Sequence, residues 1–239
     1  MCLTCTRSAA VHLGSCLLGL VLLVGAGLSA HAQAGGDAIY GVTSLDVAAS
    51  ATGPAVALLK QYRDGARQQP GNLGVELLAE LGAPNRFLIY ETWADQSAYD
   101  SNEKAAPSAE LRDKLKPIAG APYDRRDYHV VSVAAARAAS APGIIYMQLH
   151  LDVFPPGLTP ALAAVKQVAE AARKGDGNLR YDVVQSVKPP LSHMTLLAAW
   201  QSRKAFDQYE MSDYGRRFRD AVGPLLGSPF DDRLYVPVD

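Results

Sequence analysis

An internal duplication is the feature that most limits what this chain can fold into. The pair Ile39-Tyr40 recurs 106 positions later as Ile145-Tyr146. Further along the chain the offset becomes 107, and the segment 120–126 (GAPYDRR) matches 227–233 (GSPFDDR). Two related offsets held over most of the chain indicate two tandem copies of one unit of roughly 100 residues.

Each copy predicts the same order of elements: a strand, a helix, a hairpin of two strands, a helix and a last strand. Asp95 and Ser202 are the expected N-caps of the second helix in the two copies, and Thr159 is the expected N-cap of the first helix in the second copy. Pro107 is expected to interrupt the second helix of the first copy. In that copy the predicted strands cover 39–47, 73–81, 86–93 and 126–133, with a hairpin loop at 82–85 and helices over 54–69 and from 96 towards 116.

The order β-α-β-β-α-β is the ferredoxin-like arrangement, which leaves one face of its four-stranded sheet uncovered. The second copy is the nearest partner for that face. The predicted fold class is therefore α+β, with two tandem ferredoxin-like (βαββαβ) units packed sheet to sheet as a pseudo-dimeric α/β barrel. The units are predicted at 37–133 and 144–239, joined by an Ala/Ser/Pro/Gly-rich linker at 134–143.

Residues 1–34 are predicted to be a signal peptide. Arg7 precedes an apolar run, 17–28, and small residues at Ala32 and Ala34 offer cleavage sites. The run of about 12 residues is too short to span a hydrocarbon core of about 30 Å. We therefore expect a bacterial periplasmic or secreted protein that has no membrane partner once the signal is removed.

The composition excludes several classes of function. All three cysteines lie in the predicted signal peptide, so disulfides, thiolate catalysis and cysteine-ligated metals are not expected. The formal net charge of -1 gives no indication of nucleic-acid binding. The pairs Arg125-Arg126 and Arg216-Arg217 are interpreted as solvated faces. The histidines at 129, 150 and 193 show no metal-ligand spacing, so no metal is expected.

The tryptophan-containing segments of the two copies suggest a family. In each copy a Trp ends the third strand and is followed by a polar cap and a helix with an inward aromatic residue. The stretches 90–99 (YETWADQSAY) and 199–206 (AWQSRKAF) resemble the antibiotic biosynthesis monooxygenase (ABM) superfamily of dimeric α/β barrels. The resemblance spans both copies. It implies a cofactor-independent monooxygenase whose partners are a small aromatic molecule, such as a quinol or an anthrone-type phenol, and dioxygen.

In that family the substrate lies between sheet and helices, which implies a set of site residues. Glu103 and Glu210 stand ten residues after the two tryptophans and are candidate proton acceptors, although solvated helix ends are the alternative. His150 is a candidate base present in the second copy alone, with a structural role as the alternative. Candidate substrate-binding residues are Trp93, Trp200, Tyr40, Tyr146, Tyr99 and Phe206, and the tryptophans serve equally well as core anchors.

Two other functions compete with the oxygenase. One is a non-catalytic small-ligand-binding or stress-associated barrel that keeps the fold alone. The other is haem binding, ranked last because related haem-degrading enzymes carry a His where Glu103 and Glu210 stand. The first strand of the second copy is the more polar, with Gln148 and His150 where the first copy has Val42 and Ser44. We therefore expect activity first in the second unit.

Overall fold

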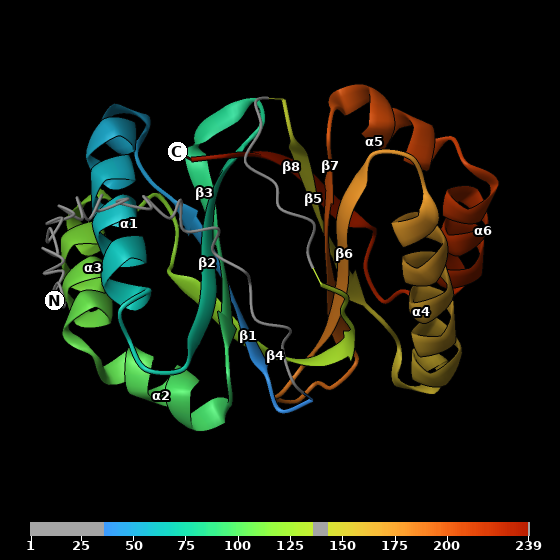
Figure 1. Cartoon of the computed structure of the whole chain (residues 1–239), viewed down its shortest axis with the longest axis horizontal. Helices are drawn as coiled ribbons and strands as arrows, with labels where there is room; N and C mark the ends of the chain where they lie inside the picture. The colour runs from blue at the N-terminus through green and yellow to red at the C-terminus, as the bar shows by residue number, and fades with distance from the viewer. Residues whose placement is uncertain (1–35, 136–142, 239) are drawn as a thin grey trace, which may run out of the picture. The chain divides into compact units, whose positions relative to one another are not determined.

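A computed structural model describes residues 36–135 and 143–238 (Figure 1). The predicted signal peptide and most of the predicted linker lie outside the described residues. The first copy forms β1 (Ile39–Asp46), α1 (Thr52–Ala66), β2 (Asn72–Glu80), β3 (Ala83–Trp93), α2 (Gln96–Lys104), α3 (Ala106–Leu115) and β4 (Asp124–Ser132). The second forms β5 (Ile145–Asp152), α4 (Leu158–Lys174), β6 (Asn178–Ser186), β7 (His193–Trp200), α5 (Arg203–Glu210), α6 (Asp213–Val222) and β8 (Asp231–Pro237).

The eight strands close into one barrel in the order β1-β3-β2-β8-β5-β7-β6-β4. Within each copy the first strand lies between the third and the last strand and pairs with both in antiparallel fashion. The copies are joined at two seams: β2 pairs with β8, and β4 pairs with β6. The predicted pseudo-dimeric barrel is confirmed, and pairing of the sheet edges leaves neither sheet with an open edge.

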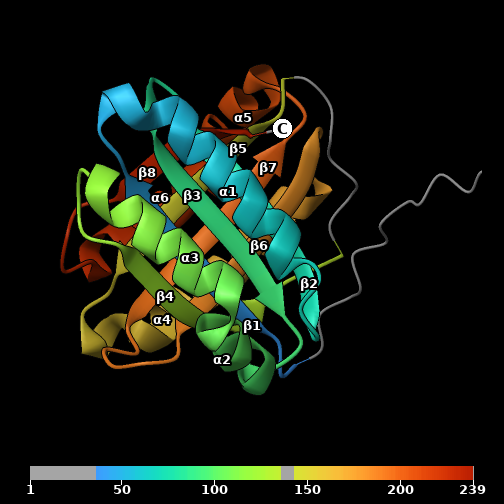
Figure 2. The ribbon, with the colours of Figure 1, turned by 90° about the vertical axis from the view of Figure 1, so that its left-hand side faces the viewer.

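Three buried layers follow from this closure. The helices α1, α2 and α3 cover the sheet of the first copy, and α4, α5 and α6 cover that of the second (Figure 1). Figure 2 shows α1 and α3 crossing in front of the strands of the first copy. One apolar core lies between each set of helices and the barrel wall, and a third core, containing Tyr40, Tyr90, Tyr128, Tyr146 and Tyr235, fills the barrel itself.

Two of the three expected helix caps are confirmed. The Asp95 carboxylate accepts a hydrogen bond of 2.8 Å from the Ala98 backbone N–H, and the Ser202 hydroxyl accepts one of 3.2 Å from Ala205. The prediction for Thr159 is wrong. A short 3₁₀ turn, Pro155–Gly157, leads directly into α4, so the helix begins at Leu158, two residues earlier than an N-cap at Thr159 requires, and Thr159 lies in its first turn.

The second helical region is broken in both copies, whereas Pro107 predicts a break in the first alone. Pro107 lies in the first turn of α3, as expected. In the second copy Ser212 starts a new helix by accepting a 3.0 Å hydrogen bond from the Gly215 N–H. A Cβ on Gly215 would lie 2.6 Å from the Tyr209 carbonyl oxygen, so glycine permits the close crossing of α5 and α6.

The hairpin loop of the first copy is shorter than predicted. β3 begins at Ala83, so Leu81 and Gly82 alone separate it from β2. Gly82 has a φ of 89°, a conformation that glycine adopts without strain. Pro84 is accommodated inside the strand, near its start, where loss of one ladder donor costs least.

Candidate functional site

The structure distributes the predicted site residues over three places instead of one. The first group lies between sheet and helices of the first unit, the second occupies the same layer of the second unit, and the third faces the barrel interior. These groups are Trp93, Tyr99 and Glu103; Trp200, Phe206 and Glu210; and Tyr40, Tyr146 and His150.

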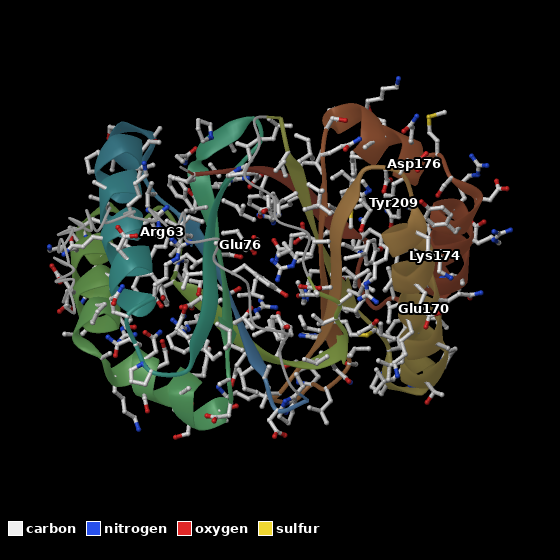
Figure 3. All side chains as sticks on the ribbon, viewed as in Figure 1. Arg63, Glu76, Glu170, Lys174, Asp176 and Tyr209 are labelled. Atoms are coloured by element: carbon white, nitrogen blue, oxygen red, sulfur yellow. The ribbon has the colours of Figure 1, made fainter. Side chains whose placement is uncertain are left out.

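Both tryptophans are completely packed. Trp93 is 0% exposed and Trp200 is 1% exposed. The Trp200 ring packs at centroid distances of 5.3 Å from Phe206 and 4.8 Å from Tyr209, the residue labelled beside the helices of the second unit in Figure 3. Such aromatic contacts anchor the helices to the sheet. Both Trp side chains are thus buried in the layer between sheet and helices, one in each unit.

Glu103 and Glu210 also share a role. Glu210 accepts two hydrogen bonds from Arg219, at 2.8 and 3.1 Å. Glu103 lies 3.6 Å from the equivalent arginine, Arg112, so an Arg–Glu pair links the two helices of this region in each unit. Glu103 differs in one contact, because its Oε1 also lies 2.9 Å from Arg125.

Arg125 belongs to a buried polar cluster in the first unit. Its Nη2 lies 3.1 Å from the Glu91 Oε2, and the side chains are 5% and 0% exposed. The Tyr62 hydroxyl donates a 2.6 Å hydrogen bond to the other Glu91 oxygen. Arg125 donates to the Tyr62 and Tyr99 hydroxyls at 3.2 and 3.1 Å. We call Tyr62, Glu91, Tyr99 and Arg125 the Arg125 cluster.

Strand alternation places these groups on the helix-facing side of the barrel wall. Glu91 lies two residues before Trp93 on β3, and its neighbour across β1 is Gly41. A Cβ on Gly41 would lie 3.1 Å from the Glu91 carboxylate and 3.0 Å from the Tyr99 ring. Arg125 reaches the same face from β4, opposite Thr43. Glycine at position 41 thus makes room for the carboxylate inside an otherwise apolar layer.

Burial and charge set the protonation properties of the cluster. Burial raises the pKa of Glu91 above its ordinary value, and Arg125 and the Tyr62 hydrogen bond oppose that rise without cancelling it. Burial also raises the pKa of Tyr99 to about 12. Burial acts to lower the pKa of Arg125, but Glu91 and the tyrosines outweigh it and hold the guanidinium charged. The cluster therefore combines a fixed cation with a carboxylate that binds a proton more readily than usual.

The second unit lacks this cluster. At the equivalent positions, 106 or 107 residues later, four of the side chains are apolar and the fifth is an exposed carboxylate. Gly41, Tyr62, Glu91, Tyr99 and Arg125 correspond to Met147, Val168, Ala198, Phe206 and Asp232. The first four of these second-unit residues are fully or almost fully buried, and the Asp232 carboxylate is an exposed partner of Arg219. The second unit thus shows that this fold forms without buried charge in that layer.

Two cavities approach the cluster from the surface. One, of about 140 Å³, lies between α1 and α3 and reaches Tyr62. The other, of about 250 Å³, is mostly apolar, and Tyr123 on its wall hydrogen-bonds the Arg125 guanidinium. We call the second one the helix cavity; it is lined by Leu45, Asp46, Val47, Arg112, Leu115, Lys116, Ala119, Ala121, Pro122 and Tyr123.

Tyr146 is tied into a polar link between the units inside the barrel. Its hydroxyl donates a 3.0 Å hydrogen bond to Glu76, which stands on the barrel wall at β2 (Figure 3). Arg180 on β6 pairs with Glu76 and with Asp182, and its guanidinium lies 4.6 Å from the centre of the Tyr90 ring. Glu76 and Tyr90 come from the first unit and the others from the second, so this network connects the two copies.

His150 lies at one end of the barrel. Its Nδ1 is 3.3 Å from the Thr195 hydroxyl, and its Nε2 is 3.5 Å from Arg126. Burial, Arg126 and His193 lower the pKa of His150, which therefore carries no charge at neutral pH. It lines the axial pocket, a polar cavity of about 240 Å³ bounded by Val42, Ser44, Asp124, Arg126, Tyr128, Gln148, His150, Asp231 and Arg233.

Of the Arg125 cluster, Tyr99 was identified from the sequence, whereas Tyr62, Glu91 and Arg125 were missed. The interpretation of Arg125-Arg126 as a solvated pair is wrong for Arg125, because strand alternation turns it into the helix-facing layer while Arg126 remains 45% exposed. Glu91 stands between the apolar residues Ile89 and Trp93 on the helix-facing side of β3. A carboxylate on an otherwise apolar face is the signal that could have identified it.

In residues 36–135 and 143–238, no group of three or more His, Cys, Asp or Glu side chains is placed to hold a metal ion. No helix in this part of the chain has the combined length and apolar character needed to cross a membrane.

The chain is similar in sequence to a known family and in fold to several solved structures. The sequence model of the antibiotic biosynthesis monooxygenase family matches residues 39–111 and 144–221, one stretch in each unit. No curated protein sequence matches the chain. A provisionally named monooxygenase from Fusobacterium nucleatum has a TM-score of 0.75 at 12% identity, covering 84% of this chain and 93% of that one.

Two further solved structures share the full barrel. A provisionally named monooxygenase from Lactobacillus acidophilus has a TM-score of 0.70 at 11% identity, covering 85% of this chain and 95% of that one. An anthrone oxidase-like protein has a TM-score of 0.70 at 11% identity, with 85% and 92% covered. At such identities the similarity establishes the shared fold.

Proposed function

Because the chain belongs to the antibiotic biosynthesis monooxygenase family, we propose that it oxidises an electron-rich phenol or quinol with dioxygen and without a cofactor. The name of the anthrone oxidase-like protein with this fold suggests the same class of substrate. We place the reaction in the first unit, at the Arg125 cluster. This placement differs from the expectation from strand polarity, which pointed to the second unit.

One observation carries the placement: a buried Arg–Glu pair occupies the first unit where the second unit is apolar. Removing charged groups from water costs several kcal/mol per ion unless pairing compensates for it. The fold does not require this cost, because the second copy builds the same layer with Val168 and Ala198. Perturbed, buried charges beside a cavity are typical of sites selected for chemistry.

The residues suit the formation of a phenolate. A ring bound in the helix cavity meets Tyr123, and displacement of that half-buried side chain exposes the Arg125 guanidinium to the substrate oxygen. Arg125 stabilises the negative charge that develops when the phenol loses its proton. Glu91, with its raised pKa, takes up the proton, and the Tyr62 hydroxyl holds the carboxylate in place.

The remaining chemistry takes place between substrate and oxygen. An anthrone-type substrate reacts as its enol, whose hydroxyl carries the phenol proton that Glu91 removes, and the resulting anion bears negative charge on the former CH₂ carbon. That carbon adds dioxygen to give a peroxide anion, which recovers the proton held by Glu91. Loss of water then breaks the O–O bond and leaves a carbonyl. Two hydrogens leave the carbon, one oxygen atom enters it, and the other leaves as water. Dioxygen accepts all four electrons.

Oxygen uptake with 1,8-dihydroxyanthrone tests this proposal. Arg125→Met is expected to lower kcat by a factor of about 10² to 10³, as for loss of one donor to a developing anion. Glu210→Gln in the second unit is the control and is expected to leave the rate unchanged. Oxygen uptake equal to that of the protein-free solution would overturn the proposal. Binding of the anthrone without oxygen uptake would instead favour the ligand-binding barrel, for which the complete packing of both tryptophans is the supporting observation.

Export is a second part of the proposal. It rests on the apolar run 17–28 and on the small residues that follow it. The periplasmic or secreted protein is expected to begin after Ala32 or Ala34, which N-terminal sequencing of protein recovered from the bacterial periplasm determines. Recovery of the uncleaved chain in the cytoplasmic fraction would contradict export.

A further inference from the structure

Three cavities at one end of the barrel share wall residues, and we call the three together the trench. The helix cavity shares Leu45, Asp46, Ala121, Pro122 and Tyr123 with a larger cleft of about 640 Å³ at the barrel mouth. We call this the mouth cleft; it is bounded by residues of β1, β2, β3, β4 and β8. The mouth cleft in turn shares Ser44, Asp124, Arg126 and Arg233 with the axial pocket. The shared walls place the three cavities next to one another, in a row that leads from the helix cavity to the axial pocket.

The character of the walls changes along the trench. The helix cavity is lined mainly by aliphatic side chains such as Leu45, Val47 and Leu115. The axial pocket is lined almost entirely by polar side chains, among them Gln148 and His150. An apolar ring matches the first part, whereas the far part requires a ligand rich in hydrogen-bonding groups.

The polar part carries almost no net charge. Arg126 pairs with Asp124 at 2.8 Å, and Arg233 pairs with Asp231 at 2.9 Å. Elsewhere in the trench Arg86 lies between Asp46 and Glu80, at 3.3 and 3.7 Å. His150 adds no charge at neutral pH. A ligand with a charged tail would therefore face groups of both signs, while hydroxyl groups can donate to the carboxylates and accept from the guanidiniums.

The axial pocket, unlike the Arg125 cluster, retains its charged groups in both units. Asp124 and Arg126 correspond to Asp231 and Arg233, 107 residues later, and all four line the same pocket. Each aspartate fixes one edge of its arginine, which orients the remaining N–H groups. The pocket is thus a preformed set of paired donors and acceptors where the two units meet.

We propose that the substrate is a phenolic ring bearing an uncharged polyhydroxylated tail, such as a glycosyl group, which lies in the mouth cleft and axial pocket. This inference rests on the proposed function, since the ring occupies the helix cavity. The tail receives hydrogen bonds from Arg233 and Arg126 and directs the ring towards Tyr123. Arg233 acts in specificity and does not touch the reacting atoms.

Anaerobic binding of two probes tests the inference: 1,8-dihydroxyanthrone and its 8-O-β-glucoside, followed by quenching of tryptophan fluorescence. The glucoside is expected to bind about tenfold more tightly, the gain from one or two added hydrogen bonds. Arg233→Gln is expected to abolish this advantage and to leave the affinity for the parent anthrone unchanged. Arg203→Gln removes an arginine from an exposed ion pair on α5 and is the matched control, expected to keep the advantage.

Each result has one meaning. Equal affinities for the two probes, or an advantage that survives in Arg233→Gln, overturn the inference. Thermal unfolding of the variants shows that a lost advantage is not a loss of fold. The glucoside can also bind more tightly in an Arg233-dependent manner while oxygen uptake with either probe equals that of the protein-free solution. In that case the trench is a glycoside site and the proposed oxygenase function fails alone.

Discussion

The Glu91 carboxylate and the Arg125 guanidinium lie 3.1 Å apart in a layer where neither side chain is more than 5% exposed. They come from β3 and β4, which are both neighbours of β1 but do not pair with each other. Gly41 on β1 provides the gap across which they meet. The pair is therefore built from three strands of one unit.

Replacing the buried polar residues of the first unit with apolar ones tests whether the pair stabilises the fold. Glu91→Ala alone is expected to lower the free energy of unfolding by about 3–5 kcal/mol, because Arg125 is left buried without its partner. The combination Gly41→Met, Tyr62→Val, Glu91→Ala and Arg125→Met is expected to regain the original stability or exceed it by about 1–4 kcal/mol. Urea denaturation measures both. A combined variant as unstable as Glu91→Ala would show that the pair contributes to the fold itself.

In a chain that keeps Glu91, Gly41 is expected to tolerate no side chain without cost. The added methyl group of Gly41→Ala meets Glu91 and Tyr99 at 3.1 and 3.0 Å, so one of them must move. We expect a loss of about 1–3 kcal/mol in stability, as for overpacking, together with a lower kcat. Gly53→Ala is the matched control, since its methyl group meets nothing within 4 Å inside α1 and alanine favours a helix. Equal effects at the two positions would contradict this account.

The raised pKa of Glu91 predicts an acid limb in the activity. The carboxylate must be unprotonated to accept the substrate proton, so kcat/KM is expected to rise with pH through a value above the ordinary glutamate range. The same shift acts on stability: the folded state holds the proton more tightly, so this group's contribution falls as pH rises from the ordinary to the raised pKa. Rate profiles and urea denaturation of wild type and Glu91→Gln check both signs. A limb that persists unchanged in Glu91→Gln assigns it to another group.

The fold could be predicted from the sequence because its sequence signals are local and occur in both copies. The period-2 pattern of strands such as 39–47 and the two caps at Asp95 and Ser202 define the elements, and the duplication defines their pairing partner. The ends of helices and strands were harder to predict. The start of α4 and the break before α6 depend on a 3₁₀ turn and on the close approach of Gly215 to Tyr209, which are consequences of tertiary packing.

The candidate site was harder to predict from the sequence because no short motif contains its residues. Its members come from β1, α1, β3, α2 and β4, and each is ordinary in its own neighbourhood. Arg125 and Arg126 are adjacent and chemically identical, and only the direction of the strand at that position decides which of them is buried. The differences between copies carried the usable signal, because Glu91 against Ala198 and Arg125 against Asp232 mark charge in one unit alone.

His150 predicts a pH dependence of opposite sign to that of Glu91. Burial and the neighbouring Arg126 lower its pKa, so the folded state binds this proton less well than the unfolded chain. Stability from this group is therefore complete above the ordinary histidine pKa and is lost as pH falls towards the lowered value. His193, Asp152 and Asp231 also face the ring and remain in place in His150→Gln. Urea denaturation between about pH 5 and 7 is expected to give a flatter profile for that variant; an unchanged profile would contradict the assignment.

Glu103 and Glu210 provide a final comparison between the two units. Both pair with an arginine of the following helix, but Glu103 alone also contacts Arg125. Each side chain is about a third exposed or less, so Glu103→Gln and Glu210→Gln are each expected to change stability by no more than about 1 kcal/mol. Activity separates them. Loss of the negative charge beside Arg125 alters how the guanidinium is shared between Glu91 and the substrate, so Glu103→Gln is expected to change KM for the anthrone several-fold, whereas Glu210→Gln leaves it unchanged. Steady-state oxygen uptake with both variants measures this difference, and identical KM values would move the reaction away from the Arg125 cluster.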